Sequence, residues 1–370
     1  MNTIHRHRLA RRQPARAFTL VELMVVIGII SLLIAIALPA FSAARTAAKR
    51  ASTEAMISTL STGADMFHAD SALMFHADSA LGGAYPPSVM TVVQPNPINN
   101  RQIAVCGANL LVWGLAGADL LGTPGFRDLD NSGTRPEGDI FGGWTNDMGS
   151  NPAQPRVNLY ALSGTKPYHP RSGPYVDLSK VRLTKQMAPN SLDFQVPAGG
   201  GYLNSHAFLD AWDQPILYYK ANPNAKYIAD EGSVNAVNAA VRSPASYSTV
   251  DSAVGKRYYA PSGIYNLFDN AIITGGGTGS GMDFGAGRAH FSPDRNATNP
   301  RPMLGNPTVS PTNSAFESQN PPGSFVRHIF NPSISAVATP HRPDSFILLS
   351  AGADGLFGTA DDVANFPINK

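Results

Sequence analysis

The chain of 370 residues is poor in cysteine and in charge. Cys106 is the only cysteine, so no intrachain disulfide is possible. Charged residues make up 15% of the chain, and the formal net charge is +2. The first 17 residues contain five arginines and no acid, which leaves 23 basic and 26 acidic residues in the remainder. This near balance lacks the bulk basicity of nucleic-acid-binding proteins, so we expect no nucleic-acid partner.

Common catalytic motifs are also lacking. The sequence has no G-x-S-x-G, no H-E-x-x-H and no phosphate loop ending in Gly-Lys-Ser/Thr. We therefore expect that the chain is not an enzyme. Its 34 glycines and 30 prolines predict many loops and short strands beyond the N-terminal region.

One long apolar run is present, from Phe18 to Phe41, and Glu22 is its only charged residue. As a helix the run would extend about 36 Å at about 1.5 Å per residue, enough to cross a bilayer. The preceding arginines predict a leader that stays cytoplasmic, with the rest of the chain on the far side.

A carboxylate at the centre of a membrane helix costs about 2.5–3.5 kcal/mol, and less near an end, so it normally has a partner. If the chain is cut after Ala17, the new amino group of Phe18 can be that partner, in the same or a neighbouring subunit. We interpret Glu22 as an assembly residue.

The string from Ala17 to Leu23, Ala-Phe-Thr-Leu-Val-Glu-Leu, resembles the cleavage and methylation motif of type IV prepilins and type II secretion pseudopilins. The resemblance implies cleavage between Ala17 and Phe18 by a membrane prepilin peptidase, and N-methylation of Phe18. Ala17 stands where the family usually has glycine. A signal peptide cut near Ala37 or Ala40, an uncut anchor and a twin-arginine signal are alternatives. Glu22 disfavours the first two, and the residues after Arg11-Arg12 disfavour the third.

The fold expected from this resemblance is α+β and pilin-like, with a long N-terminal helix packed on a small antiparallel sheet. The expected parts are a cytoplasmic leader (1–17), a transmembrane and assembly helix (18–41), the exported half of the helix (42–84) and an exported globular domain (85–370). Large loop-rich insertions are expected at about 88–200 and 221–340. An exact tandem repeat, Met66–Leu73 and Met74–Leu81, turns the helix face by about 80° between its copies. We interpret it as a tolerated duplication rather than as a metal site using its histidines and aspartates.

Two stretches in the second half of the chain, residues 210–219 and 345–362, have patterns that predict local structure. Asp210–Tyr219 looks like the "DPWG-NPY-Y" string of major pseudopilins and predicts a turn followed by a strand, Ile216–Tyr219. Residues 345–350 predict a buried strand. Asp354, Asp361 and Asp362 follow, interrupted by glycines. Their spacing alone fits either a calcium loop or a solvated acidic turn.

The same acidic string resembles the calcium loop of the major pseudopilin. The resemblance implies calcium as a cofactor, with Asp354, Asp361 and Asp362 as side-chain ligands and backbone carbonyls of Ala351 or Thr359 completing the shell. A weaker candidate loop contains Asp128, Asp130, Ser132 and Asp139 at EF-hand spacing. Pro136 and an aspartate in place of the usual final glutamate favour a turn without metal there.

The resemblance implies a pseudopilin that polymerises into a helical type II secretion pseudopilus and drives protein export across the outer membrane. Its partners would be further copies of itself, minor pseudopilins, the prepilin peptidase, the secretion platform and its ATPase. It would cross the inner membrane once, with a periplasmic C-terminal domain. The alternative is a major or minor type IV pilin of a surface pilus for adhesion or DNA uptake. A monomeric anchored surface protein would leave Glu22 unexplained.

Overall fold

The structure is a computed structural model that describes residues 20–74, 85–86, 88, 91–93, 103–117, 120–123, 162–163, 165–167, 171–184, 206–221, 265, 267–270, 273, 305, 309–334 and 339–368. The leader and the cleavage site at Ala17 and Phe18 lie outside these residues, as do the second copy of the repeat beyond Met74 and the weaker acidic loop at 128–139.

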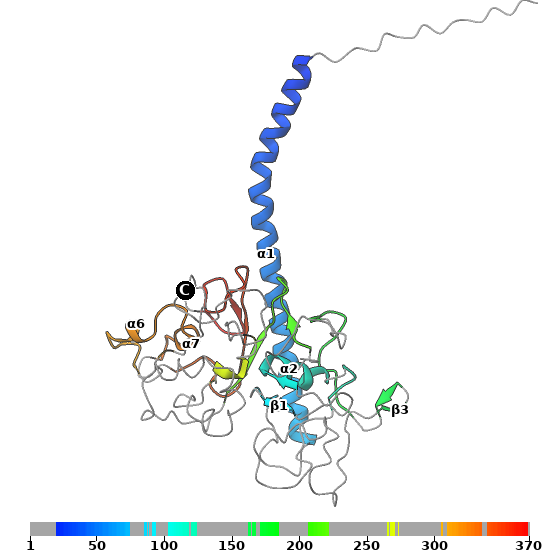
Figure 1. The fold of residues 1–370 in the computed structure, drawn as a ribbon, viewed down its shortest axis with the longest axis vertical. Coiled ribbons are helices and arrows are strands. Elements are labelled where there is room, and N and C mark those ends of the chain that lie inside the picture. Colours follow the sequence, from blue (N-terminus) through cyan, green and yellow to red (C-terminus); the bar gives the residue numbers. More distant parts are fainter. Residues whose placement is uncertain are drawn as a thin grey trace, which may run out of the picture. The chain divides into compact units, whose positions relative to one another are not determined.

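The longest element is the helix α1, Leu20–Met74, which continues through Pro39 (Figure 1). The chain divides into two compact units, Met1–Ala48 and Lys49–Lys370, and α1 contributes residues to both. Proline removes one backbone donor from a helix. Just beyond it, the Ser42 hydroxyl donates to the Pro39 carbonyl oxygen at 2.9 Å. The predicted N-terminal helix is therefore present, and no described residue between its ends leaves the helical conformation.

Within the second unit, one side of α1 is buried. Thr53, Ile57, Leu60, Ala64 and Phe67 recur at intervals of three or four residues and are almost fully buried. This spacing places them on one helix face, where they pack with strands of the same unit. The amphipathic pattern thus explains why this part of the helix, though rich in alanine, docks in one orientation.

The first copy of the tandem repeat contributes to this docking. The ring of Phe67 meets Tyr175 edge-on at a centroid distance of 5.8 Å, and His68 stacks on Tyr85 at 4.4 Å. The Tyr85 hydroxyl also donates to Asp65 at 3.0 Å. His68 therefore has a packing role in the described part of the repeat.

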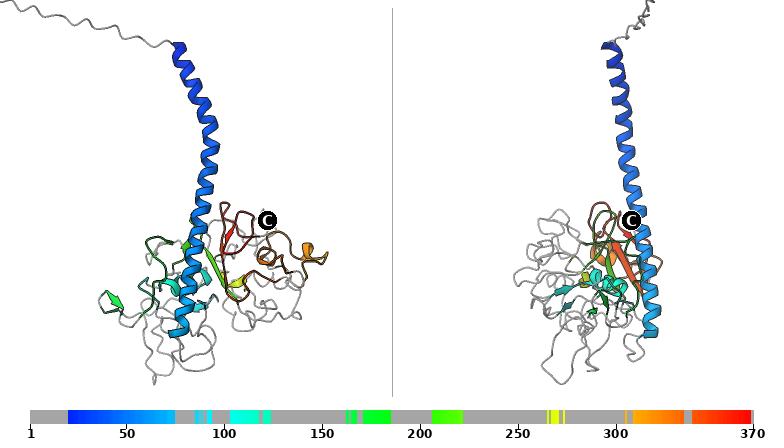
Figure 2. Two further views of the ribbon diagram at one scale, coloured as in Figure 1. Left: turned by 180° about the vertical axis from the view of Figure 1, so that it is seen from behind. Right: turned by 90° about the vertical axis from the view of Figure 1, so that its right-hand side faces the viewer.

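The main sheet of the described residues has three antiparallel strands in the order β7-β8-β9. They are β7 (Leu217–Lys220), β8 (Phe346–Ser350) and β9 (Val363–Ala364). Leu217 pairs with Leu349, and Ser350 pairs with Val363. All five residues of β8 are buried, as its apolar sequence predicts. Figure 2 shows the strands of this unit beside α1 in two further views. The predicted strands near 216–219 and 345–350 are confirmed, with bounds shifted by one residue.

Further elements are short. Two-stranded antiparallel sheets are formed by β1 (Thr91–Val93) with β2 (Ile103–Val105), β3 (Leu162–Ser163) with β4 (Lys166–Pro167), and β5 (Arg182–Leu183) with β6 (Phe208–Leu209). The remaining helices are α2 (Gly107–Ala116), the 3-10 helix η4 (Leu267–Asn270), α6 (Phe316–Gln319) and α7 (Phe325–Ile329).

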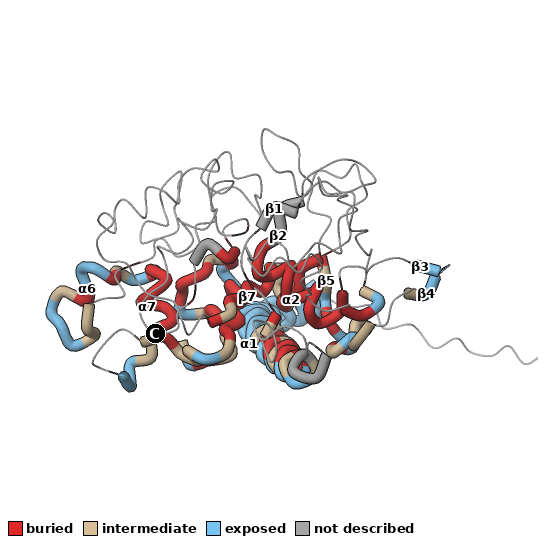
Figure 3. The backbone as a smooth tube through the Cα atoms, turned by 90° about the horizontal axis from the view of Figure 1, so that it is seen from below, coloured by how far each residue is buried: buried red, intermediate tan, exposed pale blue. Residues whose placement is uncertain are grey.

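The core of the second unit contains two hydrophobic clusters on either side of the main sheet's strands. One gathers α1, α2 and alternate residues of the strands, including Leu60, Leu111 and Phe346. The other gathers the remaining strand residues with α7, including Tyr219 and Phe325. Figure 3 shows buried residues along α2 and also around α7. The expected α+β class is confirmed, and a long N-terminal helix with small antiparallel sheets is consistent with a pilin-like fold.

Residues 107–116 lie within the region expected to be a loop-rich insertion, yet every one of them is buried in α2. The chain enters the helix at Cys106, whose backbone N–H donates to the Asn109 side chain at 3.1 Å. The apolar side chains Leu110, Leu111 and Leu115 fill the cluster beside α1. This part of the 88–200 region is therefore an element of the core.

Candidate functional site

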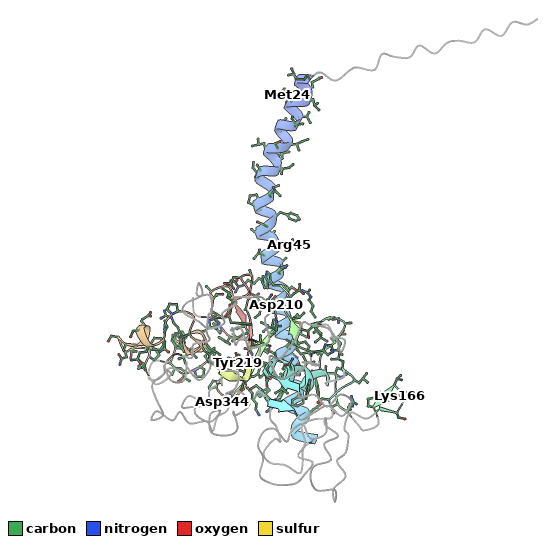
Figure 4. The ribbon with its side chains drawn as sticks, viewed as in Figure 1. Met24, Arg45, Lys166, Asp210, Tyr219 and Asp344 are labelled. Carbon is green, nitrogen blue, oxygen red and sulfur yellow. The ribbon has the colours of Figure 1, made fainter. Side chains whose placement is uncertain are left out.

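The N-terminal part of α1 exposes an apolar surface. Its large apolar side chains from Leu20 to Phe41 are exposed, and Figure 4 labels Met24 among them. Among the described residues, α1 is the one helix whose length and composition would allow it to cross a membrane. Such a surface on a protein in water would be costly, which favours burial in lipid or against other helices.

Glu22 lies in the first turn of α1 and is exposed. A negative charge near a helix N-terminus interacts favourably with the helix dipole, by about 0.3–1 kcal/mol. The position of the residue thus suits a local helix-stabilising contact as well as contact with a terminal amine. Because Ala17 and Phe18 lie outside the described residues, the proposed contact with the Phe18 amine stays a prediction.

The C-terminal acidic string forms the connection between β8 and β9. Three of its glycines, Gly352, Gly355 and Gly358, have φ values of 63°, 69° and 85°. A side chain in this left-handed region is strained, and at Gly352 a Cβ would lie only 2.5 Å from the Asp361 carbonyl oxygen. The glycines therefore let the loop fold back tightly on itself.

This fold brings the three predicted ligands together. One carboxylate oxygen from each of Asp354, Asp361 and Asp362 lies within 4.8 Å of the others. Backbone N–H groups hold the acids in place: Ala353 and Asp354 donate to Asp361 Oδ2 at 2.7 and 3.0 Å. Leu356 donates to Asp354 Oδ1 at 2.8 Å, and Gly358 donates to Asp362 Oδ2 at 2.7 Å. The cluster is thus built by the backbone of the loop itself.

Thr359 joins two of the carboxylates through its side chain. Its hydroxyl oxygen lies in hydrogen-bond range of Asp361 Oδ1, of Asp362 Oδ1 at 2.9 Å and of the Leu356 carbonyl oxygen at 3.2 Å. A hydroxyl has one hydrogen, so it can donate to one of these three acceptors at a time. The sequence pointed to the Thr359 backbone carbonyl, whereas the structure brings its hydroxyl to the carboxylates.

The electrostatics of the cluster are uneven. Burial raises the pKa of Asp354 to about 6, and the nearby charges of Asp361 and Asp362 add to the rise. Burial also acts to raise the pKa of Asp361, but hydrogen bonds from Thr359, Asp354 and Ala353 outweigh it and lower the pKa below its ordinary value. The charged form of Asp354 is thus disfavoured beside two other acids. A hard divalent cation such as calcium, which prefers carboxylate and carbonyl oxygens, fits this donor set.

The two strings singled out in the second half of the chain meet in space. Ser350, the last residue of β8, donates its hydroxyl to Asp210 Oδ2 at 2.6 Å. Asp210 Oδ1 accepts the N–H groups of Trp212 and Gln214 at 2.8 and 2.9 Å, as expected of a turn residue. Burial raises the pKa of Asp210, and these hydrogen bonds act in the opposite direction. The turn before β7 is thereby fastened to the start of the acidic loop.

Asp213 in this turn has a φ of 64°. It stands at the glycine position of the "DPWG" string that the turn resembles. Aspartate tolerates the left-handed region better than most residues. Its carboxylate pairs with the Arg182 guanidinium, which also donates to the Asp210 carbonyl oxygen at 3.1 Å. The departure from glycine is therefore accommodated without loss of the turn.

A histidine beside the acidic cluster was not predicted from the sequence. His328 of α7 places Nε2 3.0 Å from Asp362 Oδ2, and both side chains are buried. No sequence signal links a histidine in a five-residue helix to an acid 34 positions later.

The comparison with known families identifies the N-terminus. Residues 12–38 match the prokaryotic N-terminal methylation motif. The chain carries a prepilin-type N-terminal motif. This supports a type IV pilin or pseudopilin-like protein and implies processing by a prepilin peptidase and assembly into a pilus-like polymer. The motif family is structural rather than catalytic, and with the apolar helix it is consistent with membrane anchoring. No curated protein and no solved structure is significantly similar to the chain.

Proposed function

We propose that the chain is a pseudopilin of a type II secretion system, without enzymatic activity, that polymerises into a periplasmic pseudopilus and drives protein export across the outer membrane. The observation that carries the proposal is the prepilin motif at residues 12–38 on a helix whose apolar side chains from Leu20 to Phe41 are exposed. The acidic loop and the Asp210–Tyr219 string favour the pseudopilin over other proteins that share this N-terminus.

Assembly would proceed by packing of the exposed apolar helices of successive subunits. Removal of the leader after Ala17 creates a positive amino group at Phe18, four residues before Glu22. In an apolar surrounding, opposite charges attract strongly and unpaired charges are costly. An incoming subunit whose amine meets the Glu22 carboxylate of its neighbour is therefore favoured over one in any other register. Minor pseudopilins, the secretion platform and its ATPase would act on this polymer from outside the chain.

The substitution Glu22→Ala tests this mechanism. It removes the carboxylate and leaves the apolar run intact, so membrane insertion is expected to be unchanged while filament formation is lost. The readouts are membrane fractionation and electron microscopy of filaments from cells that carry the rest of the system. Glu54→Ala is the matched control, because Glu54 is an exposed acid of the same helix that pairs with Arg50 at 3.1 Å. Filaments of normal length from Glu22→Ala would contradict the proposal.

For the C-terminal loop we propose that calcium binds Asp354, Asp361 and Asp362, with backbone oxygens such as those of Ala351 or Thr359 completing the shell. The bound cation would neutralise the three acids and hold the loop in a chain that has no disulfide. Calorimetric titration of the full chain in detergent with calcium chloride tests this. We expect one site per chain that is lost in Asp361→Asn and kept in Asp344→Asn, a variant of an exposed aspartate outside the loop. Absence of binding by the unaltered chain would refute the calcium site.

The second candidate is a major or minor type IV pilin of a surface pilus, which the same N-terminal motif supports. The genes beside this one discriminate between the two. Genes for a secretion channel and its ATPase would support the pseudopilin, and genes for pilus retraction would support the pilin.

A further inference from the structure

The segment that contains α6 and α7, residues 309–334, lies against the acidic loop. His328 Nε2 lies 3.0 Å from Asp362 Oδ2, and the two side chains are 4% and 0% exposed. A Cβ on Gly358 would lie 3.0 Å from the Gly323 carbonyl oxygen, so the backbones of the loop and the segment are in close approach. The conformation of the loop is therefore not independent of this segment.

Apolar packing fixes α7 at this place. Phe325, Val326 and Ile329 belong to one hydrophobic cluster together with Phe357 of the acidic loop. The ring of Phe325 also packs on Tyr219 of β7 at a centroid distance of 5.1 Å. The helix is thus anchored between the main sheet and the loop, and this anchoring places the His328 ring beside the Asp362 carboxylate.

The contact with His328 orients one particular acid. Asp362 Oδ2 accepts from the backbone N–H of Gly358 at 2.7 Å, and Oδ1 lies 2.9 Å from the Thr359 hydroxyl. His328 Nε2, at 3.0 Å from Oδ2, adds a close buried polar contact to this carboxylate, at ion-pair distance but outside hydrogen-bond geometry. Groups that orient a metal ligand in this way commonly contribute about 10–100-fold to metal affinity.

We propose that His328 is a positioning residue for cation binding by the C-terminal loop, and that a bound calcium ion and the docked helix α7 stabilise each other. The inference rests on the calcium site proposed above. By linkage, if docking of α7 raises the calcium affinity, calcium strengthens the docking of α7 by the same factor. Helix α7 lies in the region 221–340 that was expected to be an insertion, and in this proposal it supports the metal site.

Hydrogen exchange on the unaltered full chain in detergent tests the coupling without any substitution. Exchange is compared in calcium chloride and in a chelator. We expect calcium to slow amide exchange in the loop at residues 351–363 and also in α7, where the His328 and Phe330 amides donate to Ser324 and Val326. Protection confined to the loop would overturn the proposal.

Variants of His328 test the positioning role. His328→Leu removes the polar ring beside Asp362 at similar volume and is expected to weaken calcium binding about 10–100-fold in calorimetry. His328→Gln, which can offer an amide donor, is expected to restore most of the affinity. Arg327→Gln is the control. Arg327 pairs with Glu317 at 2.6 Å, so this substitution perturbs α7 on a side that does not face the acidic loop.

The outcomes separate the two proposals. A wild-type affinity in folded His328→Leu overturns the positioning role and leaves the calcium site standing. No calcium binding by the unaltered chain overturns both. If His328→Leu fails to fold, the exchange experiment on the unaltered chain decides the coupling.

Discussion

The substitution Asp354→Asn is expected to stabilise the calcium-free protein at pH 7 while it weakens calcium binding. Asparagine keeps the Oδ1 acceptor that receives the Leu356 N–H at 2.8 Å. It removes the charge that the neighbouring carboxylates of Asp361 and Asp362 repel. The charge of Asp354 is thus expected to destabilise the calcium-free loop, in keeping with the calcium site proposed above.

The size of the effect follows from the shifted pKa. Burial raises the pKa of Asp354 from an ordinary 3.8 to about 6. Each pKa unit corresponds to about 1.36 kcal/mol, which gives at most about 3 kcal/mol. The Asp354 side chain is only partly desolvated and remains largely open to solvent, so screening reduces the expected gain to about 1 kcal/mol. In a domain of this size that gain raises Tm by about 2 °C.

The pH dependence has a defined sign. A carboxyl whose pKa is higher in the folded than in the unfolded state stabilises the fold when it is protonated, and this contribution is lost as pH rises through about 6. The free energy of unfolding of the unaltered chain therefore approaches that of Asp354→Asn as pH falls below 6. The difference between them should vanish below about pH 4.

Thermal unfolding followed by intrinsic fluorescence, in detergent with a chelator, measures both chains between pH 4 and pH 8. Added calcium chloride should raise the Tm of the unaltered chain and change that of Asp354→Asn little. A variant that is less stable than the unaltered chain at pH 7 without calcium would refute the reasoning.

Three further substitutions test the core and the loop. Leu60→Ala opens a cavity under α1, where the side chain is fully buried, and should lower the free energy of unfolding by about 2–5 kcal/mol in urea titrations. Ser350→Ala removes the hydroxyl that donates to buried Asp210 at 2.6 Å and should cost about 1–3 kcal/mol by the same measurement. Gly352→Ala places a Cβ 2.5 Å from a backbone oxygen at a φ of 63°. The strain should distort the loop, so we expect calcium binding to be lost in calorimetry while Tm falls only slightly.

The elements that the sequence predicts well are those with a strong local pattern. The apolar run and the alanine-rich stretch predict α1, and the run Phe346–Ser350 predicts a buried strand. The acids and glycines of the C-terminal string predict a tight loop with clustered carboxylates. Each of these signals lies within one short window of the sequence, where residue type and spacing are enough.

The missed features depend on contacts between distant parts of the chain. The helix α7 has five residues, too few for a periodic pattern, and its position comes from packing of Phe325 on Tyr219. The hydrogen bond from Ser350 to Asp210 joins residues 140 positions apart. Burial of α2 depends in the same way on the strands and on α1. Tertiary packing decides such features, and a single sequence does not encode it in any local window.

The order in which the strands of the main sheet are synthesised has a consequence for folding. The central strand β8 lies near the C-terminus, and Leu349 pairs with Leu217 on one side and Ala364 on the other. Contacts of such long sequence separation form late in folding. A growing chain therefore cannot complete this core until nearly its whole length has been synthesised. A product that stops before residue 346 would leave β7 without its only strand partner among the described residues.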